Sequence, residues 1–143
     1  MDYWDTSALA KLYVGESDSA LFSARVTNSG PVTSSELTRW EIYRVFVRKE
    51  VEGQIPVGAA EALFDRFLAH VTAGTVTLLP MSAAIEERFR KLIQQLRGSN
   101  PPLLIRTLDG IHLATADTKH TMVATDGNLR KCSAALGLQV FPV

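Results

Sequence analysis

Residues 107–141, TLDGIHLATADTKHTMVATDGNLRKCSAALGLQVF, contain the pattern that decides the fold. Apolar residues at helical spacing over residues 108–118 lead into an apolar and β-branched run at 121–125, which predicts a helix followed by a strand. A second pair follows, with a helix over 129–136 and a strand over 138–141. Strands that alternate with helices predict a parallel sheet covered by helices on both faces.

The rest of the chain continues this alternation. Short strands are predicted at residues 3–4, 31–33 and 76–79, and helices at 7–13, 17–26, 35–51, 57–72 and 82–96. Two helices rather than one lie between the second and third strands, so that crossover is enlarged. The length of 143 residues suits one domain better than two. We therefore expect a single α/β domain over residues 1–143.

The composition excludes several classes of protein. Hydrophobic residues make up 46% of the chain, and 15 basic side chains balance 15 acidic ones, so no global positive charge indicates nucleic-acid binding. A single cysteine excludes a disulfide framework and a cysteine-rich zinc site. No apolar run is long enough for a membrane span, and no signal peptide opens the chain. We expect a cytoplasmic protein that does not associate with membranes.

Two aspartates follow predicted strands directly. Asp5 comes after the first strand, and Asp126 comes after the strand at 121–125. Ligands of open parallel sheets bind outside the carboxyl ends of the strands, which makes both residues candidates for a functional site. Aspartate is also a preferred helix N-cap, and Asp126-Gly127 is a common turn dipeptide, so a purely structural role stays open for each.

Glu41 is a third candidate, because it shares a helical stripe with the apolar Leu37 and Val45. A carboxylate on an inward stripe needs a cation or a hydrogen-bond donor, and an arginine of the same helix is the structural alternative. Glu36 competes with Glu41. However, residues 33–36 match a capping box, which is a sufficient role for Glu36.

Asp109 is a fourth candidate, in the first turn of the helix over 108–118. The helix dipole favours an acidic residue there and gives it a structural explanation as well. His112 lies three residues later. We interpret His112 as a buried structural histidine rather than a ligand, because hard cations prefer oxygen.

Four segments together resemble the PIN-domain family, and most closely its VapC-type toxins of bacterial toxin–antitoxin pairs. They are DTSALAKLY at 5–13, the segment from Ser34 to Glu41, RTLDGIHLATA at 106–116, and the closing segment from Thr125 to Leu138. Their order and spacing agree with the family over the whole chain. Gly110 departs from the pattern, because alanine is common there, and the first strand is unusually short.

The resemblance implies a Rossmann-like three-layer α/β/α fold and a ribonuclease that depends on Mg²⁺ or Mn²⁺. It implies that Asp5 and Asp109 hold the metal, with Glu41 and Asp126 acting directly or through water. The small hydroxyl residues Thr6, Ser7 and Thr125 match supporting positions. It also implies an RNA substrate, with tRNA among the candidates, a VapB-type antitoxin and a homodimer.

The charges of the chain support this interpretation. Two carboxylates about 5 Å apart repel each other by roughly 3 kcal/mol at an effective dielectric of about 20. A cluster of four must therefore bind a cation or take up protons through raised pKa values. Without the four candidates, 11 acidic side chains remain against 15 basic ones, a balance of +4 that suits RNA phosphates. The candidate phosphate contacts are Arg39, Arg44 and Arg48.

Two other functions are compatible with parts of this pattern. A catalytically silent PIN-like module that binds a protein is the main alternative, because spacing alone does not demonstrate metal binding. A phosphatase with an aspartyl nucleophile is disfavoured, since it needs an acid two residues after the nucleophile and Asp5 is followed by Thr6-Ser7.

Overall fold

The fold is built on one sheet of five parallel strands. The computed structural model describes residues 1–143. The strands are β1 (Asp2–Trp4), β2 (Val32–Ser35), β3 (Val76–Leu79), β4 (Thr121–Val123) and β5 (Gln139–Phe141). They lie in the order β3-β2-β1-β4-β5, and every neighbouring pair is parallel. The predicted parallel sheet is confirmed.

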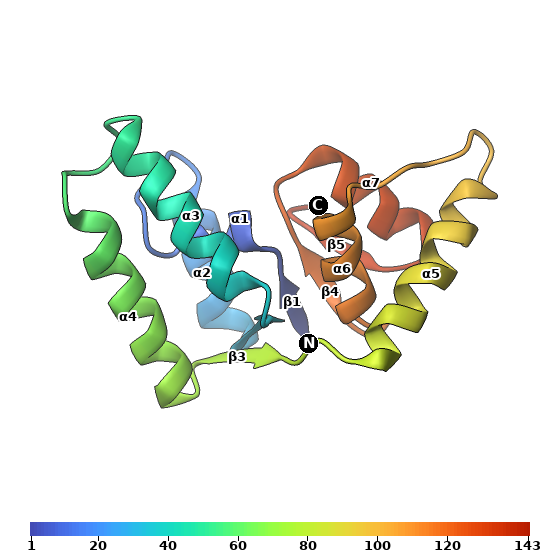
Figure 1. The fold of residues 1–143 in the computed structure, drawn as a ribbon, viewed down its shortest axis with the longest axis horizontal. Coiled ribbons are helices and arrows are strands. Elements are labelled where there is room, and N and C mark those ends of the chain that lie inside the picture. The colour runs from blue at the N-terminus through green and yellow to red at the C-terminus, as the bar shows by residue number, and fades with distance from the viewer.

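Seven helices connect the strands and divide between the two halves of the molecule. They are α1 (Thr6–Ala10), α2 (Ser19–Ser29), α3 (Thr38–Val51), α4 (Ala59–Ala73), α5 (Ala83–Arg97), α6 (Thr107–Thr115) and α7 (Gly127–Ala135). Figure 1 shows α1 to α4 to the left of β1 and α5 to α7 to its right. The enlarged crossover between β2 and β3 consists of α3 and α4, as predicted. No helix has the length and apolar character that a membrane span requires.

Two hydrophobic cores form, one on each face of the sheet. Successive strand residues point to opposite faces, so Tyr3 and Met122 join the core under α5 to α7, while Trp4 and Val123 join the core under α1 to α4. All four side chains are almost completely buried. The alternation produces the three-layer α/β/α arrangement implied by the resemblance.

The order of the strands creates a crevice beside β1. The chain proceeds from β1 outward through β2 to β3, and then returns to the other side of β1 to form β4 and β5. The connections therefore change direction between β1 and β4. A reversal of this kind leaves a ligand crevice at the carboxyl ends of the two strands. Asp5 directly follows β1, and Asp126 lies between the end of β4 at Val123 and the start of α7 at Gly127.

The start of α3 differs from the prediction. β2 continues through Ser35, and α3 begins only at Thr38, so residues 33–36 are not a capping box. Ser34 and Ser35 are fully buried, and the Ser34 hydroxyl donates to the carbonyl oxygen of Trp4. Pairing with β1 and β3 keeps these serines extended, which overrides their local preference for a helix cap.

Candidate active site

The four predicted acidic residues lie at the ends of strands and the beginnings of helices. Asp5 and Asp126 are the N-caps of α1 and α7. Glu41 and Asp109 lie in the first turns of α3 and α6. All four therefore come from short segments whose position is set by the sheet and by the helix starts.

Three of the four acids line one pocket of about 540 Å³, which we call the acidic pocket. These are Asp5, Glu41 and Asp109. Arg44, Arg48 and Arg106 line the same pocket, as do Thr6 and Ser7. Asp126, Thr125 and Arg39 are not among its lining residues. Thr125 lines a smaller neighbouring pocket with Ser7 and Arg48.

Asp5 is the most deeply buried of the four acids, with 5% of its surface exposed. One carboxylate oxygen accepts a hydrogen bond of 3.3 Å from the backbone N–H of Ser7, so the capping role also holds. Burial raises the pKa of Asp5 to about 6, against the nearby positive charge of His112, and the negative charges of Asp109 and Glu41 add to the rise. The direction of this shift agrees with the raised pKa values expected for a crowded acidic cluster, although burial is its largest cause.

Glu41 is held by a histidine and a threonine rather than by an arginine. One Glu41 oxygen lies 2.5 Å from His112 Nε2 and accepts a hydrogen bond of 2.8 Å from the Thr6 hydroxyl. The other ring nitrogen of His112 lies 2.7 Å from the Tyr3 hydroxyl. The structural alternative, a pairing of Glu41 with an arginine of its own helix, does not occur, because the α3 arginines are exposed while Glu41 contacts His112 of α6 and Thr6 of α1.

The pairing shifts both groups toward their charged forms. Burial alone would lower the pKa of His112, but the hydrogen bond to Glu41 and the charges of Asp5, Glu41 and Asp109 raise it. Burial alone would raise the pKa of Glu41, but His112 and Thr6 lower it. Both ring nitrogens of the fully buried His112 have hydrogen-bond partners, so the interpretation of His112 as a satisfied buried histidine is confirmed.

Arg106 joins the remaining two acids. Its Nε donates to Asp109 at 3.0 Å, and its Nη2 donates to Asp126 at 3.4 Å. Sequence reasoning did not single out this residue. The available signal was its place one residue before α6, where the helix dipole disfavours a cation.

The donor chemistry of the acidic pocket fits a hard divalent cation, since carboxylate oxygens from three segments face one cavity. The side chains are not arranged as a complete metal site, because no three His, Cys, Asp or Glu residues are placed so that they could hold an ion. Instead, Glu41 is paired with His112, while Asp109 and Asp126 are paired with Arg106. The residues fit the metal, while His112 holds one oxygen of Glu41 and Arg106 holds one oxygen each of Asp109 and Asp126.

The parallel sheet, the change in direction of its connections between β1 and β4, and the acidic pocket together define a class of protein. The family model described as "PIN domain" matches residues 3–132, so the chain belongs to the PIN-domain family.

A curated relative agrees with this assignment over nearly the whole chain. The chain is 32% identical to a protein named Ribonuclease VapC46 from Mycobacterium tuberculosis, over 97% of this chain and 95% of that protein. The resemblance described from the four motifs is thereby confirmed, and the chain is similar to a VapC-like ribonuclease.

Proposed function

We propose that this protein is an endoribonuclease that hydrolyses RNA phosphodiester bonds with the help of Mg²⁺ or Mn²⁺. One observation carries the proposal: Asp5, Glu41 and Asp109 come from three distant segments and meet in one pocket of a PIN domain. A buried carboxylate with a raised pKa destabilises the folded protein when it ionises, and such residues cluster at functional sites.

The roles of the four acids follow from their surroundings. A bound divalent cation supplies a nucleophile from water and relief of negative charge at phosphorus. Asp5 and Asp109 would hold the ion most directly, with Glu41 and Asp126 contributing directly or through water. The hydrogen bonds from His112 and Thr6 fix the orientation of Glu41 and keep it ionised, so it is suited to positioning the attacking water.

The RNA would approach along the basic wall of the acidic pocket. Arg44 and Arg48 lie one turn apart on α3, are exposed, and take part in no ion pair. Free guanidinium groups at this place suit phosphate contacts, which position a nucleic acid without reading its sequence. Arg39 lies outside the pocket, so its proposed contact would be to a more distant phosphate.

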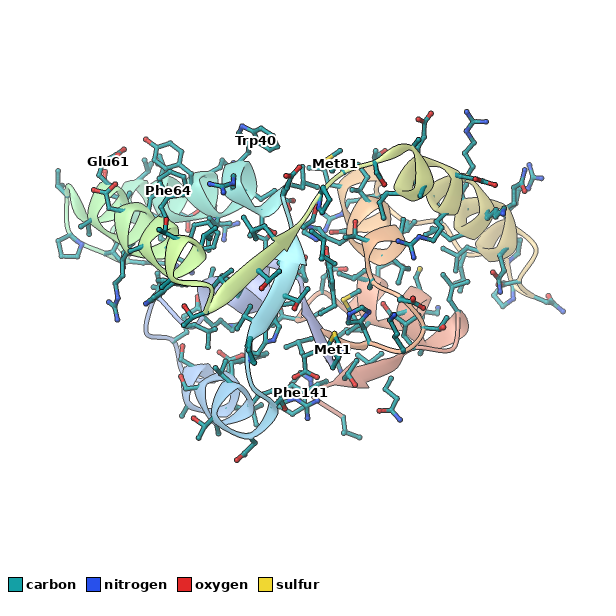
Figure 2. All side chains as sticks on the ribbon, turned by 90° about the horizontal axis from the view of Figure 1, so that it is seen from below. Met1, Trp40, Glu61, Phe64, Met81 and Phe141 are labelled. Carbon is teal, nitrogen blue, oxygen red and sulfur yellow. The ribbon has the colours of Figure 1, made fainter.

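We further propose that the protein is the toxin of a VapBC-type pair, acts in the cytoplasm, forms a homodimer and is inhibited by a VapB-type antitoxin. An apolar groove beside the acidic pocket supports an inhibitory partner. Met81, Ile85, Phe89 and Ile111 line this groove, and Thr107 lines both the groove and the pocket. A peptide seated in the groove would therefore reach the acids. Trp40, 68% exposed, projects from α3 and offers a surface for a second copy (Figure 2).

Cleavage of RNA tests the proposed activity. Wild type is incubated with total RNA and with bulk tRNA in Mn²⁺, and the new 5′ ends are mapped. We expect Asp5→Asn and Asp109→Asn to abolish cleavage without unfolding the protein, because each removes an oxygen ligand and keeps the side-chain shape. Asp65→Asn, which changes an exposed aspartate on α4, is the matched control and should cleave like wild type. Cleavage by either pocket variant at the wild-type rate would contradict the assignment.

A further inference from the structure

We propose that Arg106 is a built-in counter-ion that occupies the carboxylates of the metal-free pocket and turns to an RNA phosphate when those carboxylates bind a metal ion. This inference rests on the proposed function and adds a positioning residue to it. The observation behind it is that Asp109 of α6 and Asp126 of the β4–α7 connection both accept hydrogen bonds from the Arg106 guanidinium, and that no three acidic, His or Cys side chains are placed to hold an ion.

The bridge made by Arg106 links two separate elements. Asp109 belongs to α6, and Asp126 caps α7 while its other carboxylate oxygen accepts from the Leu129 backbone N–H at 2.8 Å. One guanidinium thus offsets part of the repulsion between two acids next to the buried Asp5. A bound metal cation would reduce the same repulsion between the acids.

The position of Arg106 is not explained by the stability of the fold. It is the N-cap of α6, makes no capping hydrogen bond, and places a cation at the positive end of a helix dipole. Its side chain is 76% exposed, and an exposed ion pair contributes only about 0–1 kcal/mol. The pairing is therefore weak enough to be released.

A released Arg106 would remain at the mouth of the acidic pocket. It lines the pocket together with Arg44 and Arg48, so three guanidinium groups face the same cavity. The planar fork of arginine matches two phosphate oxygens, a geometry that lysine does not provide. The same side chain can thus serve the carboxylates in the empty pocket and a phosphate oxygen in the complex.

The first arm of the test measures the affinity of RNA-free protein for Mn²⁺ by calorimetry at fixed salt. Arg106→Gln should bind Mn²⁺ about three- to tenfold more tightly than wild type, because one competing positive charge is lost. Arg106→Lys keeps the charge and should stay close to wild type. Arg90→Gln is the matched control, since Arg90 is 75% exposed and paired with Glu86 outside the pocket, and it should leave the affinity unchanged.

The second arm measures cleavage of bulk tRNA and total RNA at saturating Mn²⁺. Arg106→Gln should cleave more slowly despite its tighter metal binding, and Arg106→Lys should recover part of the rate. Opposite signs for metal and RNA are the expected result, since a merely structural arginine would weaken both or neither.

The outcomes separate this inference from the proposed function. If wild type binds and cleaves but Arg106→Gln binds Mn²⁺ like Arg90→Gln, the counter-ion role is wrong and the nuclease proposal stands. Unchanged cleavage by Arg106→Gln would overturn the phosphate contact. If wild type itself binds no Mn²⁺, both proposals fall together.

Discussion

At the scale of one residue, the buried carboxylate of Asp5 lowers the stability of the folded protein. The side chain is almost fully buried, its pKa is raised to about 6, and it lies near two further carboxylates. Ionising it at neutral pH therefore destabilises the metal-free protein. An uncharged side chain of the same shape would fold more easily but would lack the carboxylate oxygen that the proposed metal site requires, a trade-off between stability and function.

Replacing Asp5 by asparagine should stabilise the metal-free protein at pH 8 and have little effect at pH 4. The pKa of Asp5 in the folded protein lies above its ordinary value of 3.8, so its contribution to stability is present below about pH 4 and is lost as the pH rises through about 6. The shift corresponds to a gain of about 3 kcal/mol at pH 8 for Asp5→Asn. Asparagine can still cap α1.

Urea denaturation in EDTA from pH 4 to 8 measures this effect. His112 and Glu41 titrate in both proteins, and Asp5 raises the pKa of His112, so the difference between wild type and Asp5→Asn reports Asp5 together with its coupling to His112. Parallel stability profiles over this range would show that the carboxylate at position 5 is not forced to ionise in an unfavourable place.

The sequence predicted the acids of the site better than it predicted their partners. Asp5 and Asp126 follow apolar strand runs, a local pattern that places them at strand ends. The contacts of Glu41 with His112 and of Arg106 with Asp126 join residues 71 and 20 positions apart. No local periodicity encodes such pairs, so the sequence did not predict that His112 holds Glu41 or that Arg106 bridges Asp109 and Asp126.

At the scale of elements, the packing of α6 against α5 explains the glycine that departs from the family pattern. A Cβ atom added at Gly110 would lie 2.6 Å from Cε2 of Phe89 and 3.4 Å from Ile105 Cγ2. Phe89 is half-buried and belongs to the border of the core under α5 to α7. Glycine at position 110 therefore leaves room for the ring of Phe89.

Gly110→Ala should destabilise the wild type by about 1 kcal/mol. Alanine gains about 0.5–1 kcal/mol of helix propensity, while overpacking against the ring costs about 1–3 kcal/mol. In a Phe89→Leu background the ring atom that clashes is absent, so the same change should become stabilising by about 0.5–1 kcal/mol.

A double-mutant cycle in urea checks this packing prediction. The two backgrounds should give opposite signs for the glycine-to-alanine change. An equal effect in both backgrounds would mean that Phe89 does not limit the size of residue 110.

The residues at which helices and strands begin and end depend partly on local sequence and partly on pairing between strands. The strand at 76–79 agrees with β3, and the predicted helices correspond to the seven that form. The start of α3 was placed three residues early, because Ser35 pairs with Leu79 as the last residue of β2. Glu41 also lies beside the fully buried stripe of Thr38, Ile42 and Phe46, and its own stripe of Leu37 and Val45 is only half-buried.

At the scale of the whole molecule, the sheet brings the acids together from segments far apart in the chain. β1 lies between β2 and β4, so the segments that follow these three strands meet at one edge. Each half of the molecule has its own core, and the acidic pocket is lined by α1 and α3 from one half and α6 from the other. A ligand bound in the pocket would contact both halves and should therefore stabilise the whole folded molecule.

The unfolding temperature of the protein in Mg²⁺ and Mn²⁺ tests the central claim that the acidic pocket is a metal site. Metal at about 100 times its dissociation constant should stabilise the folded state by roughly 2.7 kcal/mol, a rise of about 5–10 °C for a chain of this size. The account predicts a saturable rise for wild type and for Asp65→Asn, and none for Asp109→Asn. No rise in wild type, or an equal rise in Asp109→Asn, would contradict it.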